Sequence, residues 1–357
     1  MHNDGPKLGR RRVIAAAALA GLGVAGGVAA PASAGPPVPT LPRRETPFRF
    51  ELDGDPHRLF ANARMYGGDY YLQSFSFDTQ NRRLFLAQLH KPAAGEPAVD
   101  LNIVQMSMTG KVQSRMSLLG FGHGVAIAAV PEGGSTYIWV EINPNASGWG
   151  SQLARLKYVP GTTIDSSDIR SGQDITVFTP VAGAGAFTAA VDPLTDRLVI
   201  RYNDVDGVRG PAHAIRFTTF PLSAACAGKF DDPVFDIVQP KLPAGSDGKA
   251  PTFQGFTAAG NFLYLLDGTA YPDHIPDRTK INSYLTAVDL RSGGIVQRSR
   301  TRAGASLDLR EPEGMAIDIG PDQRPRLCFG FCTLTEVDST VYRASIFFDR
   351  TAVPRDG

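Results

Sequence analysis

Gln254-Gly-Phe-Thr-Ala, followed over a turn by Phe262-Leu-Tyr-Leu, is the stretch that decides the fold. It opens with a polar and a small residue, continues as an alternating strand, and returns as a second apolar strand. The same pattern, with a polar residue or glycine in first place, occurs in four further copies: Gln73-Ser-Phe-Ser-Phe with Arg83-Leu-Phe-Leu, His123-Gly-Val-Ala-Ile with Tyr137-Ile-Trp-Val, Gly185-Ala-Phe-Thr-Ala with Arg197-Leu-Val-Ile, and Glu313-Gly-Met-Ala-Ile with Arg326-Leu-Cys-Phe. Five copies along one chain indicate a repeat architecture.

The spacing of the copies predicts how the repeats are built. Their first residues are 50, 62, 69 and 59 positions apart, which leaves room for four short strands in each copy. Radial repetition of four-stranded sheets protects strand edges. We therefore predict an all-β fold, a five-bladed β-propeller of four-stranded blades, whose ring is closed by an N-terminal strand at residues 48–52. A two-sheet sandwich is the alternative, but it does not by itself predict five similarly phased units.

Composition agrees with an all-β chain. Of the 357 residues, 38 are Gly and 27 are Pro, which is too many for long helices and suits short strands joined by turns. The 36 Lys and Arg residues and the 35 Asp and Glu residues leave a formal net charge of +1. This balance gives no general attraction to nucleic acid or to an anionic membrane.

The first 34 residues are typical of a twin-arginine export signal. Arg10-Arg-Arg-Val-Ile precedes an Ala- and Gly-rich stretch that runs to Ala30, and the pattern predicts a secreted or cell-wall-associated protein whose mature form has no membrane span. A membrane anchor is the alternative, because the stretch from Val13 is close to the lower length limit for spanning. The predicted organisation of the rest is a Pro-rich linker at 35–46, a single propeller at 47–350 and a tail at 351–357.

The three cysteines favour buried thiols. Cys226, Cys328 and Cys332 are an odd number and lack the spacing of a metal site. If Cys328 and Cys332 share a strand, they lie about 13 Å apart on one face, beyond the reach of a disulfide.

The first residue of each copy is expected to ring the mouth of the central channel, because the innermost strands of a propeller line its axis. This ring consists of Gln73, His123, Gly185, Gln254 and Glu313. The next residue in each copy is small, as crowded backbones near an axis require. Converging polar side chains make a candidate binding site, although buried polar rings also hold ordered water and fix blades in place.

Arg310-Glu-Pro-Glu-Gly is the most charged segment beside an expected inner strand. Glu311 and Glu313 are two residues apart, so on an extended chain they point to the same face and could hold Ca²⁺ or act as an acid and base pair. Alternatively, Arg310 pairs with one of them. His123 is a candidate general base or ligand, or a histidine that only hydrogen-bonds in the channel. We find no hydrolase elbow, zinc-protease motif or phosphate loop.

The segment before the first copy is rich in aromatic and cationic residues, among them Arg64 and Tyr66. Aromatic faces stack on sugar rings and arginine pairs with phosphate, which an anionic glycopolymer requires. Core packing and turn contacts explain the tyrosines equally well.

Three segments together resemble the TagC-like β-propeller family: residues 58–78, Gln254-Gly-Phe-Thr-Ala with residues 264–271, and Arg310-Glu-Pro-Glu-Gly-Met-Ala. This family includes actinobacterial proteins labelled teichoic acid biosynthesis protein C and the propeller domain of a staphylococcal phage receptor-binding protein. The resemblance runs from about Phe48 to Asp349. It implies a five-bladed propeller and a role connected with wall teichoic acid, and it carries over no catalytic residue.

We therefore expect an exported, monomeric module that binds a cell-envelope anionic glycopolymer through Gln73, His123, Gln254, Glu313, Arg64 and Tyr66. One alternative is a metal-assisted hydrolase or lyase acting on such a polymer with Glu311, Glu313 and His123. The other is a protein-interaction scaffold that presents its outer blade surfaces.

Overall fold

The computed structural model describes residues 48–67, 70–92, 97–170, 173–245, 248, 250–336 and 339–354. The predicted export signal and linker therefore lie outside the described residues. The described part is almost entirely β-structure, with one short helix, α1 (Leu222–Cys226), and three single 3-10 turns at 166–168, 272–274 and 278–280. None of the helices found in these ranges has the length and apolar character needed to cross a membrane.

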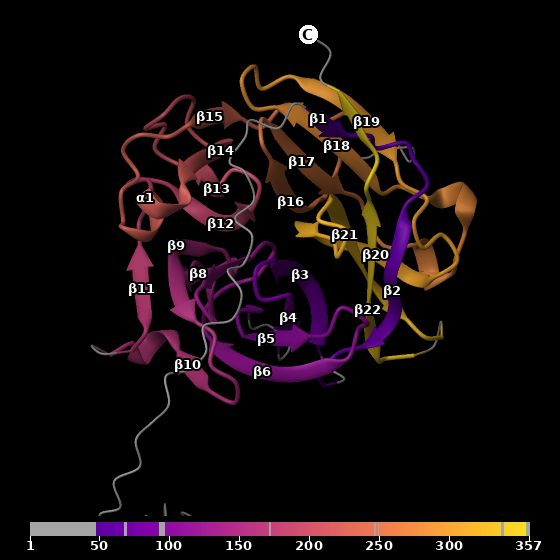
Figure 1. Ribbon diagram of the computed structural model, residues 1–357, viewed down its shortest axis with the longest axis horizontal. Coiled ribbons are helices and arrows are strands. Elements are labelled where there is room, and N and C mark those ends of the chain that lie inside the picture. The colour runs from indigo at the N-terminus through magenta and orange to yellow at the C-terminus, as the bar shows by residue number, and fades with distance from the viewer. Residues whose placement is uncertain are drawn as a thin grey trace, which may run out of the picture. The chain divides into compact units, whose positions relative to one another are not determined.

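Five antiparallel sheets are arranged around a ring, so the predicted five-bladed β-propeller is confirmed (Figure 1). The first three blades, from the innermost strand outward, are β3 (Tyr70–Asp78), β4 (Arg83–His90), β5 (Leu101–Met106) and β6 (Val112–Leu119); β7 (Ala128–Glu132), β8 (Ser135–Pro144), β9 (Gly150–Lys157) and β11 (Ile175–Phe178); and β12 (Gly185–Asp192), β13 (Arg197–Asp204), β14 (Ala214–Pro221) and β15 (Phe235–Val238). The other two are β16 (Phe253–Ala259), β17 (Phe262–Asp267), β18 (Tyr284–Asp289) and β19 (Ile295–Arg300); and β20 (Asp308–Ile319), β21 (Pro325–Leu334), β22 (Tyr342–Asp349) and β2 (His57–Arg64).

An additional strand links the first two blades. Between β9 and β11 the chain returns to the first blade as β10 (Thr163–Asp165), which runs parallel to β6. The first sheet therefore has five strands instead of the predicted four.

The ring is closed by an N-terminal strand, as predicted, but not by residues 48–52. The closing strand is β2, which pairs antiparallel with β22 and supplies the outermost strand of the last blade (Figure 1). The earlier segment forms β1 (Phe48–Phe50), which pairs with β23 (Ala352–Pro354) inside the predicted tail. With only three residues, β1 is too short to complete a blade. It instead buries Phe50, whose N–H donates to the Tyr264 hydroxyl at 2.9 Å.

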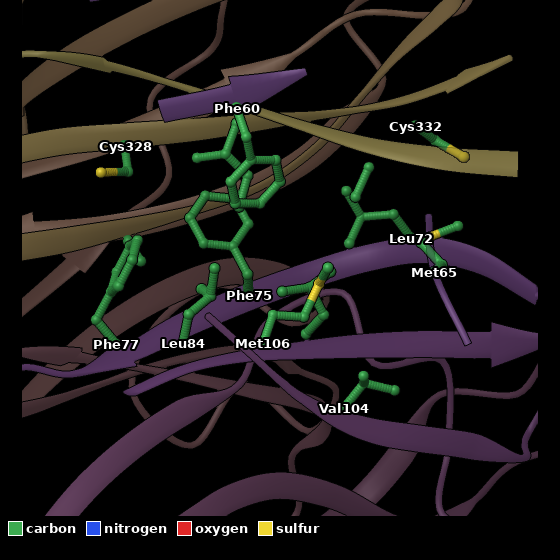
Figure 2. Packing of buried hydrophobic residues seen from close by; sticks show 14 of the residues in the cluster. Phe60, Met65, Leu72, Phe75, Phe77, Leu84, Val104, Met106, Cys328 and Cys332 are labelled. Atoms are coloured by element: carbon green, nitrogen blue, oxygen red, sulfur yellow. The ribbon is translucent and has the colours of Figure 1, made fainter. Parts of the chain in front are cut away.

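The core consists of apolar clusters between neighbouring blades. Figure 2 shows the one that joins the first and last blades, where Phe75 and Leu84 meet side chains of β2 and β21. Cys328 and Cys332 belong to this cluster and are free buried thiols, as predicted, and burial raises the pKa of both well above the usual range. Cys226 is also free but only half-buried, which differs from the prediction.

The innermost strands approach one another closely around the axis, each contacting the innermost strands of both neighbouring blades. A Cβ atom at Gly314 would lie 2.6 Å from the Ser74 Cα atom, and one at Gly255 would lie 2.8 Å from the Gly314 Cα atom. Gly314 also has φ +74°, a conformation that favours glycine. At Gly255 and Gly314, the glycine that follows the ring position is thus required by backbone crowding.

Candidate functional site

The predicted ring lies on the face where the innermost strands begin. Gln73 and Glu313 are buried, and His123, Gly185 and Gln254 are half-buried. Gln73, Gly185, Gln254 and Glu313 belong to innermost strands, whereas His123 lies in the connection before β7 because that strand starts only at Ala128.

Contacts between the small residues that come directly after the ring positions bring these positions together. The Ser74 hydroxyl donates to the Gly124 carbonyl at 2.6 Å, which ties the first copy to the second. Gly255 and Gly314 meet backbone to backbone, and Gly314 meets Ser74, so the fourth, fifth and first copies are also adjacent. These contacts join four of the five copies and do not include Gly185 of the third.

Glu313 and Glu311 form the acidic side of the ring. Burial raises the pKa of Glu313 well above its usual range, and the neighbouring Glu311 carboxylate raises it further. Burial also raises the pKa of Glu311, opposed by the nearby charge of His274. Glu313 therefore keeps its proton to a higher pH than an exposed glutamate and can donate a hydrogen bond as well as accept one.

Arg310 does not neutralise either carboxylate. It is 1% exposed, and its Nε, Nη1 and Nη2 atoms donate to Ala303 O, Ser283 Oγ and Thr301 O at 2.8, 3.0 and 3.0 Å. Its guanidinium also lies 4.3 Å from the centre of the Phe331 ring. The backbone has positive φ values at Leu309 and Arg310, and the hydrogen bonds hold this side chain against the connections at 301–303 and 283. The alternative in which Arg310 pairs with Glu311 or Glu313 is therefore wrong, because its guanidinium donates to two backbone carbonyls and a serine hydroxyl instead.

Tyrosines lie beside the acidic pair. The rings of Tyr71 and Tyr342 are 4.3 Å apart between centroids. Burial raises the pKa of Tyr342, and the hydrogen bond with Tyr71 and the charge of Glu311 act in the same direction. This part of the ring therefore combines aromatic surface with carboxyl groups.

His123 contributes a second aromatic surface. Its ring stacks on Trp149 at a centroid distance of 5.4 Å and an interplanar angle of 21°. Burial lowers the pKa of His123, which favours the neutral imidazole at neutral pH. A stacked pair of this kind suits the apolar face of a sugar better than an anionic group.

Glu141 contacts the ring but is not among the site residues predicted from the sequence. Its fully buried carboxylate accepts from Gly124 N at 2.7 Å, from Gly150 N at 2.6 Å, and from the His123 backbone. Burial, which outweighs these bonds, raises its pKa to about 7. The carboxylate holds the connection that carries His123, so Glu141 positions one member of the ring.

Arg201 is the other missed residue. It is 8% exposed, lies 4.0 Å from the centre of the Phe253 ring in the next blade, and carries charge that attracts Glu141. Burial lowers its pKa to about 10. Glu141 and Arg201 belong to the second strands β8 and β13. The repeated pattern describes second strands as apolar, so it does not predict a functional polar residue in them.

Arg64 and Tyr66 lie outside the ring. Arg64 ends the outermost strand β2, and the Tyr66 ring lies under the Arg115 guanidinium of the first blade at 4.3 Å. Gln254 stays at the ring and donates to the Gly268 carbonyl at 3.1 Å. In the ranges that the structure describes, no group of three or more His, Cys, Asp or Glu side chains is arranged to hold a metal ion.

This chain is similar to a Bacillus subtilis protein and to a solved phage structure. A Bacillus subtilis (strain 168) protein named teichoic acid biosynthesis protein C is 25% identical over 280 residues, which cover 76% of this chain and 58% of that protein. The chain thus spans little more than half of this relative. The solved tail fiber of Staphylococcus aureus phage P68 matches with a TM-score of 0.61 and 17% identity, over 83% of this chain and 53% of that chain.

The family model that matches is described as the phage 5-bladed beta propeller receptor binding platform domain, and it covers residues 71–334. This range runs from the first innermost strand through the second strand of the fifth blade. The resemblance found in the sequence is confirmed, and the chain belongs to the family of phage five-bladed β-propeller receptor-binding platform domains.

Proposed function

We propose that this protein binds a cell-envelope glycopolymer, in particular wall teichoic acid, through the ring on its central face. The observation that carries the proposal is the match of a receptor-binding propeller model to residues 71–334. The name of the Bacillus subtilis relative supports teichoic acid as the polymer.

The chemistry of the ring supports a sugar-containing ligand. The His123–Trp149 stack and the Tyr71–Tyr342 pair offer aromatic faces, and Glu313 offers a carboxyl group that can donate or accept. Sugar rings stack on aromatic faces while their hydroxyls need both donors and acceptors. Because the pKa of Glu313 is raised, the acidic side repels a phosphate-bearing polymer less than two ionised carboxylates would.

A binding assay on cell walls tests this proposal. The full chain is mixed with walls that retain or lack their anionic polymers, with and without EDTA, and retention is measured. We expect retention only on polymer-bearing walls, and about tenfold weaker binding when Glu313→Ala and Gln254→Ala are combined, since a few central residues carry most binding energy. The EDTA samples test the predicted Ca²⁺ at Glu311 and Glu313.

A matched control combines Asp232→Ala with Gln113→Ala, two exposed positions away from the ring. Control binding should equal that of the unmodified chain. Equal binding to both kinds of wall would contradict the polymer as ligand, and unchanged binding in the Glu313 and Gln254 variant would contradict the ring as the site.

One observation favours a second candidate function, a hydrolase or lyase acting on the same polymer. Glu311 and Glu313 are adjacent carboxyl groups with raised pKa values, the property of a general acid that works near neutral pH. Release of soluble fragments from polymer-bearing walls, abolished by Glu313→Gln in a folded protein, would establish this activity. Binding without fragment release would leave the recognition role alone.

Secretion through the twin-arginine pathway is part of the proposal. The segment that carries it, residues 1–34, lies outside the described residues. Replacing Arg10, Arg11 and Arg12 with lysine should keep the protein inside the producing cell, which immunoblotting of cell and medium fractions measures. Unchanged secretion of this variant would contradict the pathway.

A further inference from the structure

A cavity of about 590 Å³ lies away from the ring, at the outer side of the fourth and fifth blades. Its walls come from β2, from β22, and from the two connections at 278–281 and 302–307. Its volume is in the range of small-molecule sites. Three arginines, Arg58, Arg278 and Arg302, lie around it, and we call it the arginine pocket.

The three guanidinium groups have no anionic partner within the described ranges. All three residues are exposed, and no carboxylate there forms an ion pair with them. The acid nearest in sequence, Asp277, accepts from the Thr279 N–H at 2.9 Å and pairs with Lys280 at 3.5 Å. Three like charges around one hollow repel one another, and a bound anion would relieve that repulsion.

The inner surface of the arginine pocket is apolar. Phe347 and Ile281 are buried side chains that line it, together with half-buried Leu307. A free phosphate ion would gain nothing from these groups. A phosphate attached to a carbon skeleton would place the skeleton on them and the phosphate oxygens among the guanidinium groups.

The walls are held before any ligand arrives. Buried Arg310 donates to Ala303 O, Ser283 Oγ and Thr301 O, which fastens the connection before β20 to the one before β18. The Tyr271 hydroxyl donates to Ala305 O at 3.1 Å, a second link between the same two connections. Such preorganisation lowers the entropic cost of binding.

We propose that the arginine pocket binds a phosphorylated sugar or polyol, with Arg58, Arg278 and Arg302 contacting the phosphate. Arginine forks match phosphate oxygens in pairs, which makes a cavity lined by three arginines a site for phosphate esters. The phosphate ester is either a free small molecule or one repeat of a phosphate-linked polymer. The site is separate from the ring and does not depend on the function proposed there.

Isothermal titration of the full chain with two probes, glycerol 3-phosphate and a poly(glycerol phosphate) chain, tests the proposal, with glycerol as the uncharged reference. We expect binding that weakens with added salt, and at least about tenfold weaker binding when the three arginines are replaced by glutamine, equivalent to about 1.4 kcal/mol. Binding of both probes identifies a site for free phosphate esters, and binding of the polymer alone identifies a repeat unit.

The matched control replaces Lys111, Lys229 and Arg324 with glutamine, which changes net charge equally at exposed positions outside the pocket. It should bind as the unmodified chain does. Equal loss in both triple variants would overturn the pocket as the site, as would absence of binding to either probe by the unmodified chain. Wall retention of the Glu313→Ala and Gln254→Ala variant is measured in parallel, so failure of the pocket and failure of the ring give different results.

Discussion

Glu141 makes the stability of the propeller depend on pH in a direction that can be calculated. Its carboxylate is fully buried beside Gly124 and Gly150 and holds the connection that carries His123. In the unfolded chain the same group is in water and has its ordinary pKa. Replacing it by Glu141→Gln removes the titration and keeps nearly the same volume.

The magnitude follows from the difference between the two pKa values. The pKa rises from 4.5 in the reference state to about 7 in the fold, and each unit corresponds to about 1.36 kcal/mol. Between these values the folded state binds more protons than the unfolded state. The favourable contribution is therefore complete below pH 4.5 and is lost as pH rises through about 7, a total of about 3 kcal/mol.

Urea denaturation at intervals from pH 4 to pH 8 measures this effect. Other buried carboxyl groups also titrate, so the quantity of interest is the free energy of unfolding of the unmodified chain minus that of Glu141→Gln at each pH. This difference should fall by about 3 kcal/mol across the range. Ser151→Ala, which removes the 2.8 Å hydrogen bond to Asn143 O in the same hairpin, is the control and should give a constant difference. A constant difference for Glu141→Gln as well would refute the reasoning.

Two further predictions concern the axis and the closure of the chain. Gly314→Ala should lower the free energy of unfolding by about 2–5 kcal/mol in urea denaturation, because the new Cβ meets the Ser74 backbone at positive φ. Gly134→Ala is the control, because the space around Gly134 is open, and it should lower the free energy of unfolding much less. Equal losses of free energy in the two variants would contradict crowding at the axis. Tyr264→Phe should cost about 1–3 kcal/mol, because it leaves the buried N–H of Phe50 without its acceptor, and unchanged thermal stability would show that this bond contributes nothing.

Most of the fold could be predicted because its signal is local and repeated. An apolar second strand follows each opening pattern, and the five copies give the number of blades directly. The closing strand could not be identified, since 48–52 alternates in polarity as a strand should, whereas β2 pairs with β22 through two register shifts. Those irregularities depend on contacts with a strand almost 300 residues away, which no local pattern contains.

The site could be predicted only where it follows the repeat. Glu313 and Gln254 are found because they occupy equivalent positions in two copies. Glu141 and Arg201 lie inside the second strands β8 and β13, and their importance arises from their burial and from contacts with residues outside those strands. The arginine pocket could not be predicted from the sequence. Arg58, Arg278 and Arg302 line one cavity only because β2, from the start of the chain, joins the last blade.

Crowding at the axis determines where this propeller can bind a ligand. Where β16, β20 and β3 meet, the backbones leave no space even for a methyl group at Gly255 and Gly314. A ligand in that sector can therefore reach the ring only from the face on which the innermost strands begin. On that face the polar groups are buried and their pKa values are shifted, which favours hydroxyl groups over charged ones. At the outer side the arginines remain exposed and without anionic partners among the described residues, which favours phosphate. A polymer of alternating sugar or polyol and phosphate units presents both kinds of group, so one such chain could contact both sites, and loss of either site should then weaken its retention more than it weakens binding of a single repeat.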